Sequence, residues 1–375
     1  MGATHPVRAL LPIPSPPGGC ISKCIPFLYL DTWTHPSFHD ILTATQGVYS
    51  CPPAMRSPGS TLESAVLAYP RGIAGAQKGR CVLASVASAG RDGAGGHTLD
   101  DMMDISWRLS RQIIEITTRA GSGHPSSSLS AIDLMTALYF GGFMRYDPGR
   151  PDWPERDRFI LSKGHAAPGL YAILAEAGYF DPKLLYTLRE LDSPLEGHPN
   201  MRVLPGVEAS TGSLGQGLSI GLGHALAARV DGLDYRTYVM IGDGEADQGQ
   251  IWEASMAAAK YEADNLTAIL DYNGYQQTGP VAEVMPTLAP VVDKWQAFGW
   301  HVVEVDGHDM EQIVKTLEAA RRVRGRPQMV VAHTLKGKGL SPFDEGDNRK
   351  HGVTLTAEET ELALAELQAR RPEGS

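Results

Sequence analysis

The sequence Thr-Tyr-Val-Met-Ile-Gly-Asp-Gly occupies residues 237–244, and Leu-Thr-Ala-Ile-Leu-Asp-Tyr-Asn-Gly occupies residues 266–274. Apolar runs this short, closed by glycine and polar residues, are typical of strands buried on both faces of a parallel sheet. The alanine-rich residues 250–263 between them have the composition of a helix. This order predicts two parallel neighbouring strands joined by a crossover helix.

The chain on either side follows the same alternation. We predict further strands over residues 300–305 and 328–332, with a helix over 309–323 between them and Asp309 as its N-cap. Thr356 and Glu359 form a capping-box pattern that opens a last helix. Further helices are predicted from the 3.6-residue period or from alanine and leucine content over residues 99–120, 127–143, 166–177 and 214–230. The predicted fold class is α/β, a doubly wound, mostly parallel sheet with helices on both faces.

Residues 1–98 differ from the rest of the chain. They hold all four cysteines and 11 of the 26 prolines, and no regular hydrophobic period runs through them. We expect a disordered N-terminal extension, or a translation start assigned too far upstream, and a single domain over residues 99–375. Cys20 and Cys24 lack a second Cys/His pair at matching spacing, which favours unpaired thiols over a metal site.

Composition excludes some function classes. The net charge of −10 and the pI near 5.6 argue against nucleic-acid binding, which calls for a basic surface. No run of 18 apolar residues occurs, so we expect no membrane span. Residues 99–375 contain no cysteine, so no disulfide holds them together, and the cytoplasm is the simplest compartment.

Polar residues directly follow the ends of the two predicted strands that begin at residues 237 and 266. Asp243 lies in a Gly-Asp-Gly segment after the first strand, and Asn273 follows the second. Ligands of doubly wound folds bind beyond the carboxyl ends of the strands, where these side chains would meet. A Gly-Asp-Gly segment alone is more often a tight turn, but the second polar residue favours a Mg²⁺ or Ca²⁺ site with oxygen ligands. Gly244 would let its N–H approach a diphosphate.

Four of the twelve histidines lie in Gly/Pro/Ser-rich junctions and not in the periodic segments. Any one of them alone is more often a structural histidine, but four near a predicted phosphate and metal site favour proton transfer and hydroxyl binding. Their spacing does not fit a zinc cluster. The four are His124, His165, His198 and His351.

These motifs resemble the diphosphate-binding half of transketolase over about residues 100–352. Residues 242–244 through Asn273 are similar to the thiamine diphosphate signature. Four other motifs follow in the order found in that family: Gly-Ser-Gly-His-Pro at 121–125, Leu-Ser-Lys-Gly-His at 161–165, Gly-His-Pro at 197–199 and Thr-Gly-Ser-Leu-Gly-Gln-Gly at 211–217. The resemblance implies the thiamine diphosphate-binding fold and transfer of a two-carbon ketol unit from a ketose phosphate to an aldose phosphate.

The resemblance also implies roles for individual residues. Asp243, Asn273 and the carbonyl of Tyr275 correspond to the ligands of Mg²⁺, for which Ca²⁺ or Mn²⁺ can substitute. The implied cofactor-binding residues are His165, Gly212, Leu214, Gly244, Asn273 and His351. The implied catalytic residues are His124, His198, His351 and Glu253, of which the histidines line the substrate channel.

Two departures from the family pattern affect these expectations. Gln248 stands where the family usually has a glutamate of the network that links two active sites, and a glutamine can hydrogen-bond there but cannot carry a proton as a glutamate does. After residue 352 too few residues follow to form the family's pyrimidine-binding and C-terminal domains. We therefore expect a C-terminal subunit encoded separately, assembly of the two chains into a two-fold heterotetramer, and no activity without that partner.

Other assignments remain open at this stage. Related signatures occur in deoxyxylulose-phosphate synthase, which shares the Lys-Gly-Lys-Gly segment at 336–339, and in the alpha subunit of 2-oxo acid dehydrogenases. The histidine set favours transketolase over both. The alternative that is not an enzyme is a non-catalytic scaffold subunit. Such a subunit need not bind thiamine diphosphate or Mg²⁺.

Overall fold

A computed structural model of the chain describes residues 96–343 and 350–372. The chain divides into two units, residues 1–80 and 81–375, and every described residue belongs to the second. The extension that we expect to be disordered, residues 1–98, lies outside the described residues except for 96–98. All four cysteines also lie outside the described residues. A domain boundary at residue 98 stays a prediction. Thr98 itself is the N-cap of the first described helix and accepts a 3.2 Å hydrogen bond from the amide of Asp101.

A five-stranded parallel sheet lies at the centre of the described unit, with the strand order β1-β2-β3-β7-β6. Its strands are β1 (Arg158–Leu161), β2 (Thr237–Gly242), β3 (Leu266–Tyr272), β6 (His301–Asp306) and β7 (Gln328–His333). A two-stranded antiparallel ribbon, β4 (Tyr275–Gln276) and β5 (Gly279–Pro280), follows β3. The two deciding strands are neighbours, as predicted, with Gly242 in register with Asp271.

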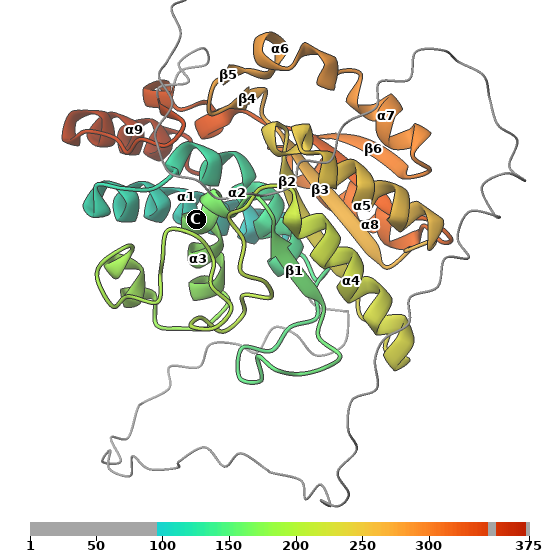
Figure 1. The fold of residues 1–375 in the computed structure, drawn as a ribbon. Coiled ribbons are helices and arrows are strands. Elements are labelled where there is room, and N and C mark those ends of the chain that lie inside the picture. Colours follow the sequence, from blue (N-terminus) through green and yellow to red (C-terminus); the bar gives the residue numbers. More distant parts are fainter. Residues whose placement is uncertain (1–95, 344–349, 373–375) are drawn as a thin grey trace, which may run out of the picture. The chain divides into compact units, whose positions relative to one another are not determined.

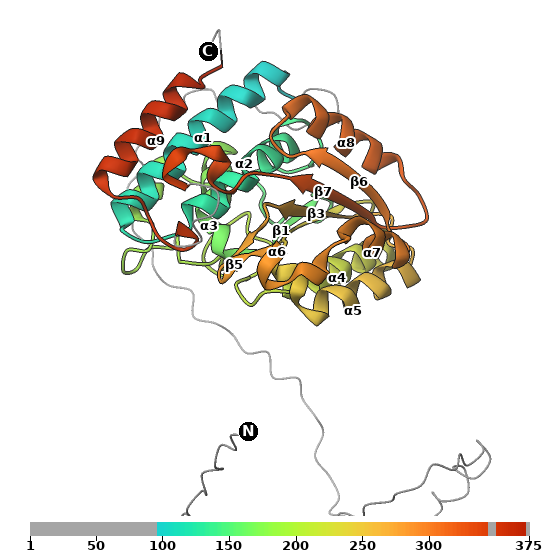
Figure 2. The ribbon, with the colours of Figure 1, turned by 90° about the horizontal axis from the view of Figure 1, so that it is seen from above.

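Helices pack on both faces of this sheet (Figures 1 and 2). One face is covered by α1 (Leu99–Ala120), α2 (Pro125–Phe140), α3 (Ala167–Glu176), α8 (Met310–Arg322) and α9 (Ala357–Ala369). The other is covered by α4 (Gln216–Asp231), α5 (Gly249–Lys260) and α7 (Val291–Ala297), while α6 (Val281–Val284) lies near the β4–β5 ribbon. Short 3₁₀ segments are Gly164–Ala166, Pro182–Thr187, Gly244–Asp247, Pro286–Leu288, Lys336–Gly339 and Ser341–Phe343.

Alternate residues of the central strands enter two separate hydrophobic cores. On β2, Tyr238 and Met240 belong to the core beneath α1, α2 and α3, whereas Val239 and Ile241 belong to the core beneath α4 and α5. A strand buried on both faces is apolar at every position for this reason. The fold class predicted from the two deciding runs is confirmed.

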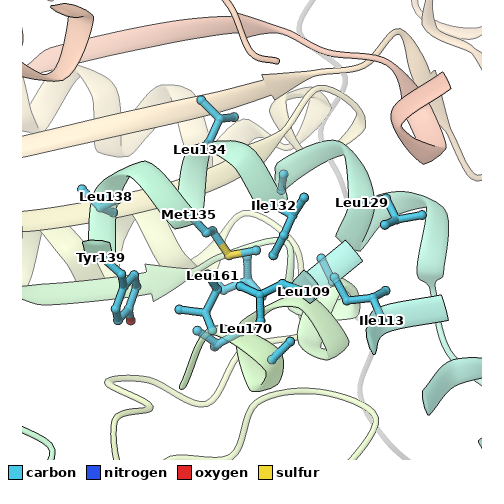
Figure 3. Packing of buried hydrophobic residues seen from close by; sticks show 14 of the residues in the cluster. Leu109, Ile113, Leu129, Ile132, Leu134, Met135, Leu138, Tyr139, Leu161 and Leu170 are labelled. Carbon is cyan, nitrogen blue, oxygen red and sulfur yellow. The ribbon is translucent and has the colours of Figure 1, made fainter. Parts of the chain in front are cut away.

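Helix α2 is buried along its whole length. All sixteen of its residues are buried, although a helix on a protein surface would keep one polar face. Its side chains form one cluster with those of α1, α3 and β1 (Figure 3). A helix enclosed on every side holds the residues at its ends in fixed positions, and its N-cap is His124.

Local signals placed most elements within a few residues of their observed bounds. Asp309 caps α8 by accepting a 3.0 Å hydrogen bond from the amide of Gln312, and the capping box of Thr356 and Glu359 opens α9. Strand β1 was not predicted because it has four residues, too few to show a period. Among the described residues, no helix combines the length and the apolar character needed to cross a bilayer.

Two glycines of α4 predict opposite responses to the same substitution. A Cβ at Gly221 would collide with the side chain of Val239 in β2, whereas a Cβ at Gly223 would meet nothing within 4 Å. We expect Gly221→Ala to lower the free energy of unfolding by about 1–3 kcal/mol through overpacking. We expect Gly223→Ala to raise it by about 0.5–1 kcal/mol through helix propensity. Urea unfolding of the two variants would check this, and equal effects at both positions would contradict the described packing of α4.

Candidate active site

A cavity of about 490 Å³ lies where the strands β1, β2 and β3 end. It brings together ten of the eleven residues to which the sequence analysis assigned a role. These are His124, His165, His198, His351, Gly212, Leu214, Asp243, Gly244, Asn273 and Tyr275. Segments more than 200 residues apart in the sequence therefore meet at the carboxyl edge of the sheet, where doubly wound folds bind their ligands.

Asp243 is buried and connects the loops that follow β2 and β3. Its Oδ1 accepts a 2.8 Å hydrogen bond from the amide of Gly244, and its Oδ2 accepts a 2.6 Å bond from the amide of Gly274. Burial, together with the nearby charge of Asp271, raises the pKa of the Asp243 carboxyl to about 7. Burial disfavours the charged form of this carboxyl group, and a bound cation would favour it. Asp243 is therefore suited to bind a cation.

Asn273 lies in the second loop with its amide oriented by neighbours. Its Oδ1 accepts a 3.1 Å bond from the amide of Tyr275, and its Nδ2 donates to Asp271 across 3.4 Å. Over residues 96–343 and 350–372 no three His, Cys, Asp or Glu side chains are arranged around a metal position. A site with one carboxylate, one amide oxygen and one carbonyl suits Mg²⁺, which completes its octahedron with phosphate oxygens and water.

Two glycines in the cavity wall pack closely against neighbouring side chains. A Cβ at Gly244 would lie 2.5 Å from the Cβ of Gln276, so no larger residue fits there. Gly212 has φ +140°, a backbone conformation that favours glycine, and a Cβ there would lie 3.0 Å from the ring of His198. Both glycines line the cavity, and the amide of Gly244 donates to Asp243 Oδ1 there.

Glu245 fixes the loops around these glycines. Its buried carboxylate accepts hydrogen bonds from Ser162 Oγ at 2.5 Å, from the amide of Gly215 at 2.8 Å and from the amide of Gly242 at 3.1 Å. These donors lie at the end of β1, at the N-cap of α4 and at the end of β2. The carboxylate therefore holds three segments of the cavity wall in register.

A buried ion pair forms another part of the wall. Lys163, which lines the cavity, pairs with the carboxylate of Asp271 and donates a 3.1 Å bond to the carbonyl of Ser127 in α2. Asp271 also accepts a 2.6 Å bond from Ser130 Oγ and one from Thr334 Oγ1. Burial would raise the pKa of Asp271, but the charge and hydrogen bond of Lys163 outweigh it and hold the pKa below its usual value.

Three of the predicted histidines form one cluster. The ring centroids of His124 and His165 are 5.1 Å apart, those of His165 and His351 are 5.4 Å apart, and those of His124 and His351 are 5.8 Å apart. Burial, reinforced by nearby cations, lowers the pKa of His124 to about 4 and that of His351 to about 3. Burial also lowers the pKa of His165 well below its usual value. All three rings are therefore neutral at pH 7.

Hydrogen bonds define what two of these rings can do. Lys336, a buried lysine after β7, donates a 2.5 Å hydrogen bond to His351 Nδ1. An ammonium group can only donate, so the remaining proton of neutral His351 is on Nε2. The Nδ1 atom of His124 is buried, and among the described residues it has no hydrogen-bond partner.

His198 differs from the other three because it is exposed on the loop at the cavity mouth. Burial and the charge of Arg189 lower its pKa. Arg189 donates a 2.6 Å bond to Ser122 Oγ and a 3.3 Å bond to the carbonyl of Gly197. It therefore connects the loop before His124 with the loop before His198.

Glu253 is the predicted catalytic residue that this cavity does not include. It lies exposed on α5 and is not among the residues that line the cavity. The geometry of this chain gives it no contact there, so its catalytic role stays a prediction. Gln248, the departure noted in the sequence, lines the cavity and is the N-cap of α5.

The sequence analysis missed several charged residues in or directly behind the cavity wall, of which Lys163 lines the cavity itself. Lys163 and Lys336 stand in quoted motifs but were given no role, because nothing local shows that a lysine is buried. Asp271 was placed in the segment that follows the second strand but was given no role, although its neighbour two residues on, Asn273, was assigned one. A sequence pattern could have identified them: a charged residue at or just after the end of an apolar strand. Such a charge is buried and therefore needs a partner.

Residues 108–370 match the sequence family described as "Transketolase, thiamine diphosphate binding domain". The chain belongs to the transketolase family. It is 48% identical over 255 residues to the 6-deoxy-6-sulfo-D-fructose transketolase subunit SqwG of Clostridium sp., a match that covers 68% of this chain and 92% of that protein. It is 44% identical over 260 residues to an apulose-4-phosphate transketolase subunit of Phocaeicola vulgatus, covering 69% and 91% of the two chains.

Longer members of the transketolase family match over part of their length. The chain is 40% identical over 273 residues to the transketolase of Homo sapiens, a match that covers 72% of this chain and 43% of that protein. A crystal structure of transketolase from Pichia stipitis superposes with a TM-score of 0.68 at 32% identity, covering 72% of this chain and 41% of that one. The family resemblance inferred from the motifs is confirmed, and the chain contains the thiamine diphosphate-binding domain of a transketolase.

The depressed pKa of His124 predicts a pH dependence of stability. Between pH 6.5 and about 4 the unfolded chain binds a proton at this position and the folded chain does not. The free energy of unfolding should therefore fall as the pH falls through this window, by about 2–3 kcal/mol for this residue. We expect His124→Gln, which cannot titrate, to lose less stability than the wild type between pH 7 and pH 4. Urea unfolding of both proteins across this pH range would measure the loss. The difference between their free energies of unfolding at pH 7 gives the effect of the substitution on packing alone. Parallel curves would contradict the assignment of a neutral, buried His124.

Proposed function

We propose that this chain is the thiamine diphosphate-binding subunit of a transketolase that transfers a two-carbon ketol unit from a ketose phosphate to an aldose phosphate. The observation that carries the proposal is the meeting of Asp243 and Asn273, from the ends of two neighbouring strands, in a cavity that also holds three neutral histidines. Membership of the transketolase family supports the same reaction class.

The residues present fit the cofactor and its metal. Asp243, Asn273 and the Tyr275 carbonyl would hold Mg²⁺, because they supply the hard oxygen ligands that this ion prefers. Gly244 lines the cavity, and the buried ammonium of Lys336 has no carboxylate within ion-pair distance among the described residues. Burial and the charge of Lys163 lower the pKa of Lys336 to about 8, so a bound anion would stabilise its charged form.

Thiamine diphosphate, when bound, supplies the carbon nucleophile with which carbon–carbon bonds of a ketose are cleaved. The chain's own residues bind and orient the reactants around it. His124 and His351 remain neutral at pH 7, so each can accept or donate a proton at a ring nitrogen. His351 presents its Nε2–H because Lys336 occupies Nδ1. His198, at the mouth, would bind hydroxyl groups of the incoming sugar, while His165 and Gly212 with Leu214 would line the cofactor.

We propose that a separately encoded C-terminal subunit completes the site and that two such pairs assemble into a heterotetramer in the cytoplasm. Support comes from the two relatives whose names call them subunits, since the matches cover 92% and 91% of their lengths. Glu253, exposed on α5, would then act at the contact with another subunit. The sugar substrates are proposed as phosphates by analogy with the family reaction.

The reaction is tested with this chain and the product of the neighbouring reading frame, purified separately and mixed. We expect the mixture to convert xylulose 5-phosphate and ribose 5-phosphate, and to leave pyruvate with glyceraldehyde 3-phosphate unchanged. Turnover of the second pair alone would favour a deoxyxylulose-phosphate synthase-type enzyme. Full ketol transfer by this chain without the second protein would contradict the proposed division between subunits.

The metal and cofactor site is tested on this chain by calorimetry. We expect Mg²⁺-dependent binding of thiamine diphosphate, and we expect Asp243→Ala to reduce the affinity by at least about 100-fold, because the variant lacks the charged metal ligand. The control is Asp293→Ala, which removes an exposed carboxylate of α7. Equal affinities of the Asp243 variant and the wild type for thiamine diphosphate would contradict the proposed metal site. Binding of thiamine diphosphate to the wild type without Mg²⁺ would contradict it as well.

A further inference from the structure

The short segment Lys336–Gly339 turns in an unusual backbone conformation. Gly337, Lys338 and Gly339 have φ of +68°, +57° and +63°. Glycine adopts this left-handed region freely, but a lysine there costs about 1–2 kcal/mol, because its Cβ crowds the backbone. Lys338 therefore keeps this conformation only because surrounding groups hold it.

A buried carboxylate on α2 provides the main anchor. Asp133 is 4% exposed, and its Oδ1 accepts a 2.8 Å hydrogen bond from Lys338 Nζ. Lys338 Nζ also donates to Ser106 Oγ of α1 across 3.0 Å. Burial would raise the pKa of Asp133, but the charge of Lys338 and the hydrogen bond of His308 lower it to about 2. The carboxylate is therefore charged and paired.

His308 connects the same carboxylate to the residue that precedes the turn. Its Nδ1 lies 2.8 Å from Asp133 Oδ2, and its Nε2 lies 2.9 Å from the amide nitrogen of Leu335. The Leu335 amide must donate, so Nε2 is the unprotonated nitrogen and Nδ1 donates to Asp133. The amide of Lys338 closes the loop by donating a 2.9 Å bond to the Leu335 carbonyl.

Arg370 holds the other end of the turn. Its guanidinium donates a 3.0 Å bond to the Lys338 carbonyl and a 2.7 Å bond to the Gly339 carbonyl. The turn is thus bound on its side chain, its amide and its carbonyls, although its sequence alone favours no single conformation. Two residues before Lys338, the side chain of Lys336 reaches His351 on the cavity wall.

We propose that the Asp133–His308–Lys338 cluster is a positioning device that holds Lys336 against His351 and so sets the cation at the cofactor cavity. Lys336 and Lys338 are separated by one left-handed glycine and reach different groups, Lys336 at the cavity and Lys338 at α2. Displacing Lys338 would release the turn and with it Lys336. The three residues of the cluster act through Lys336 and have no contact with the cavity themselves.

Helix α2 connects this cluster with the rest of the site. Ser127, Ser130 and Asp133 are spaced by three residues along it. The Ser127 carbonyl accepts from Lys163, Ser130 Oγ donates to Asp271, and Asp133 accepts from Lys338. One buried helix therefore fixes both lysines, Lys163 directly and Lys336 through the turn. The positioning role of the Asp133–His308–Lys338 cluster rests on the proposed function only in the assignment of Lys336 to a bound diphosphate.

The test measures the accessibility of Lys336 in the full chain. Each lysine is acylated with acetic anhydride for short times, and its modification rate is read by peptide mass spectrometry. We expect Lys338→Met to raise the Lys336 rate about ten-fold and to leave the rate of Lys163 unchanged, since only the turn is released. Calorimetry with thiamine diphosphate and Mg²⁺ should show an affinity lower by about ten-fold, as for other supporting partners of ligand-binding groups.

Two substitutions at His308 separate positioning from general loss of structure. His308→Gln retains one donor for Asp133 and one acceptor for Leu335, so it should keep the wild-type rate of Lys336. His308→Leu removes both and should match Lys338→Met. Lys315→Met is the control for loss of a lysine, because Lys315 pairs with Glu311 on the exposed side of α8.

The outcomes distinguish this proposal from the proposed function. An unchanged Lys336 rate in both Lys338→Met and His308→Leu would overturn the positioning role. Equal acceleration of Lys336 and Lys163 would also overturn it, because it would indicate general loosening of the fold. Absence of cofactor binding by the wild type, together with selective release of Lys336 in the variants, would uphold the positioning role and contradict the proposed function instead.

Discussion

The arrangement of the site depends on one buried carboxylate, that of Asp271. It lies at the end of β3 and receives Lys163 from the segment after β1, Ser130 from α2 and Thr334 from the segment after β7. An unpaired charge in this environment would cost several kcal/mol, so the four segments must converge on it. The loops that carry Asp243, Asn273 and His165 begin within a few residues of these contacts. Their mutual positions follow from this convergence.

The electrostatics of the cavity follow from the same arrangement. Two lysines approach it, of which Lys163 is neutralised by Asp271 and Lys336 is bonded only to a neutral imidazole among its described partners. Burial and these cations keep His124 and His351 uncharged at pH 7. A cavity with a lysine behind its wall, neutral proton carriers and the buried carboxyl group of Asp243 is complementary to a metal-bound anion. It is not complementary to a neutral apolar ligand, which could not compensate either charge.

Sequence reasoning identified what short-range patterns encode. The buried strands around Asp243 and Asn273, the cap at Asp309 and the capping box at Thr356 are local signals, and the structure confirms each as an element. The pairing of the first two strands, inferred from a single crossover helix, brought the proposed metal ligands together correctly. Strand β1 escaped because four residues give no period, and its pairing with β2 is a long-range contact. Lys163, Lys336 and Asp271 escaped for the same reason, since their burial is decided by segments far away in the sequence.

The complete burial of α2 has a consequence for how this protein can change. A helix packed on every side tolerates no larger residue and few smaller ones, because each change leaves either strain or a void. Selection for another sugar in the laboratory would therefore find few accepted substitutions among residues 125–140. Accepted changes would instead accumulate at the exposed positions around His198, whereas Leu195 and Leu204 of the same segment belong to the core. Burial therefore leaves more room for sequence change in the exposed segment around His198 than along α2.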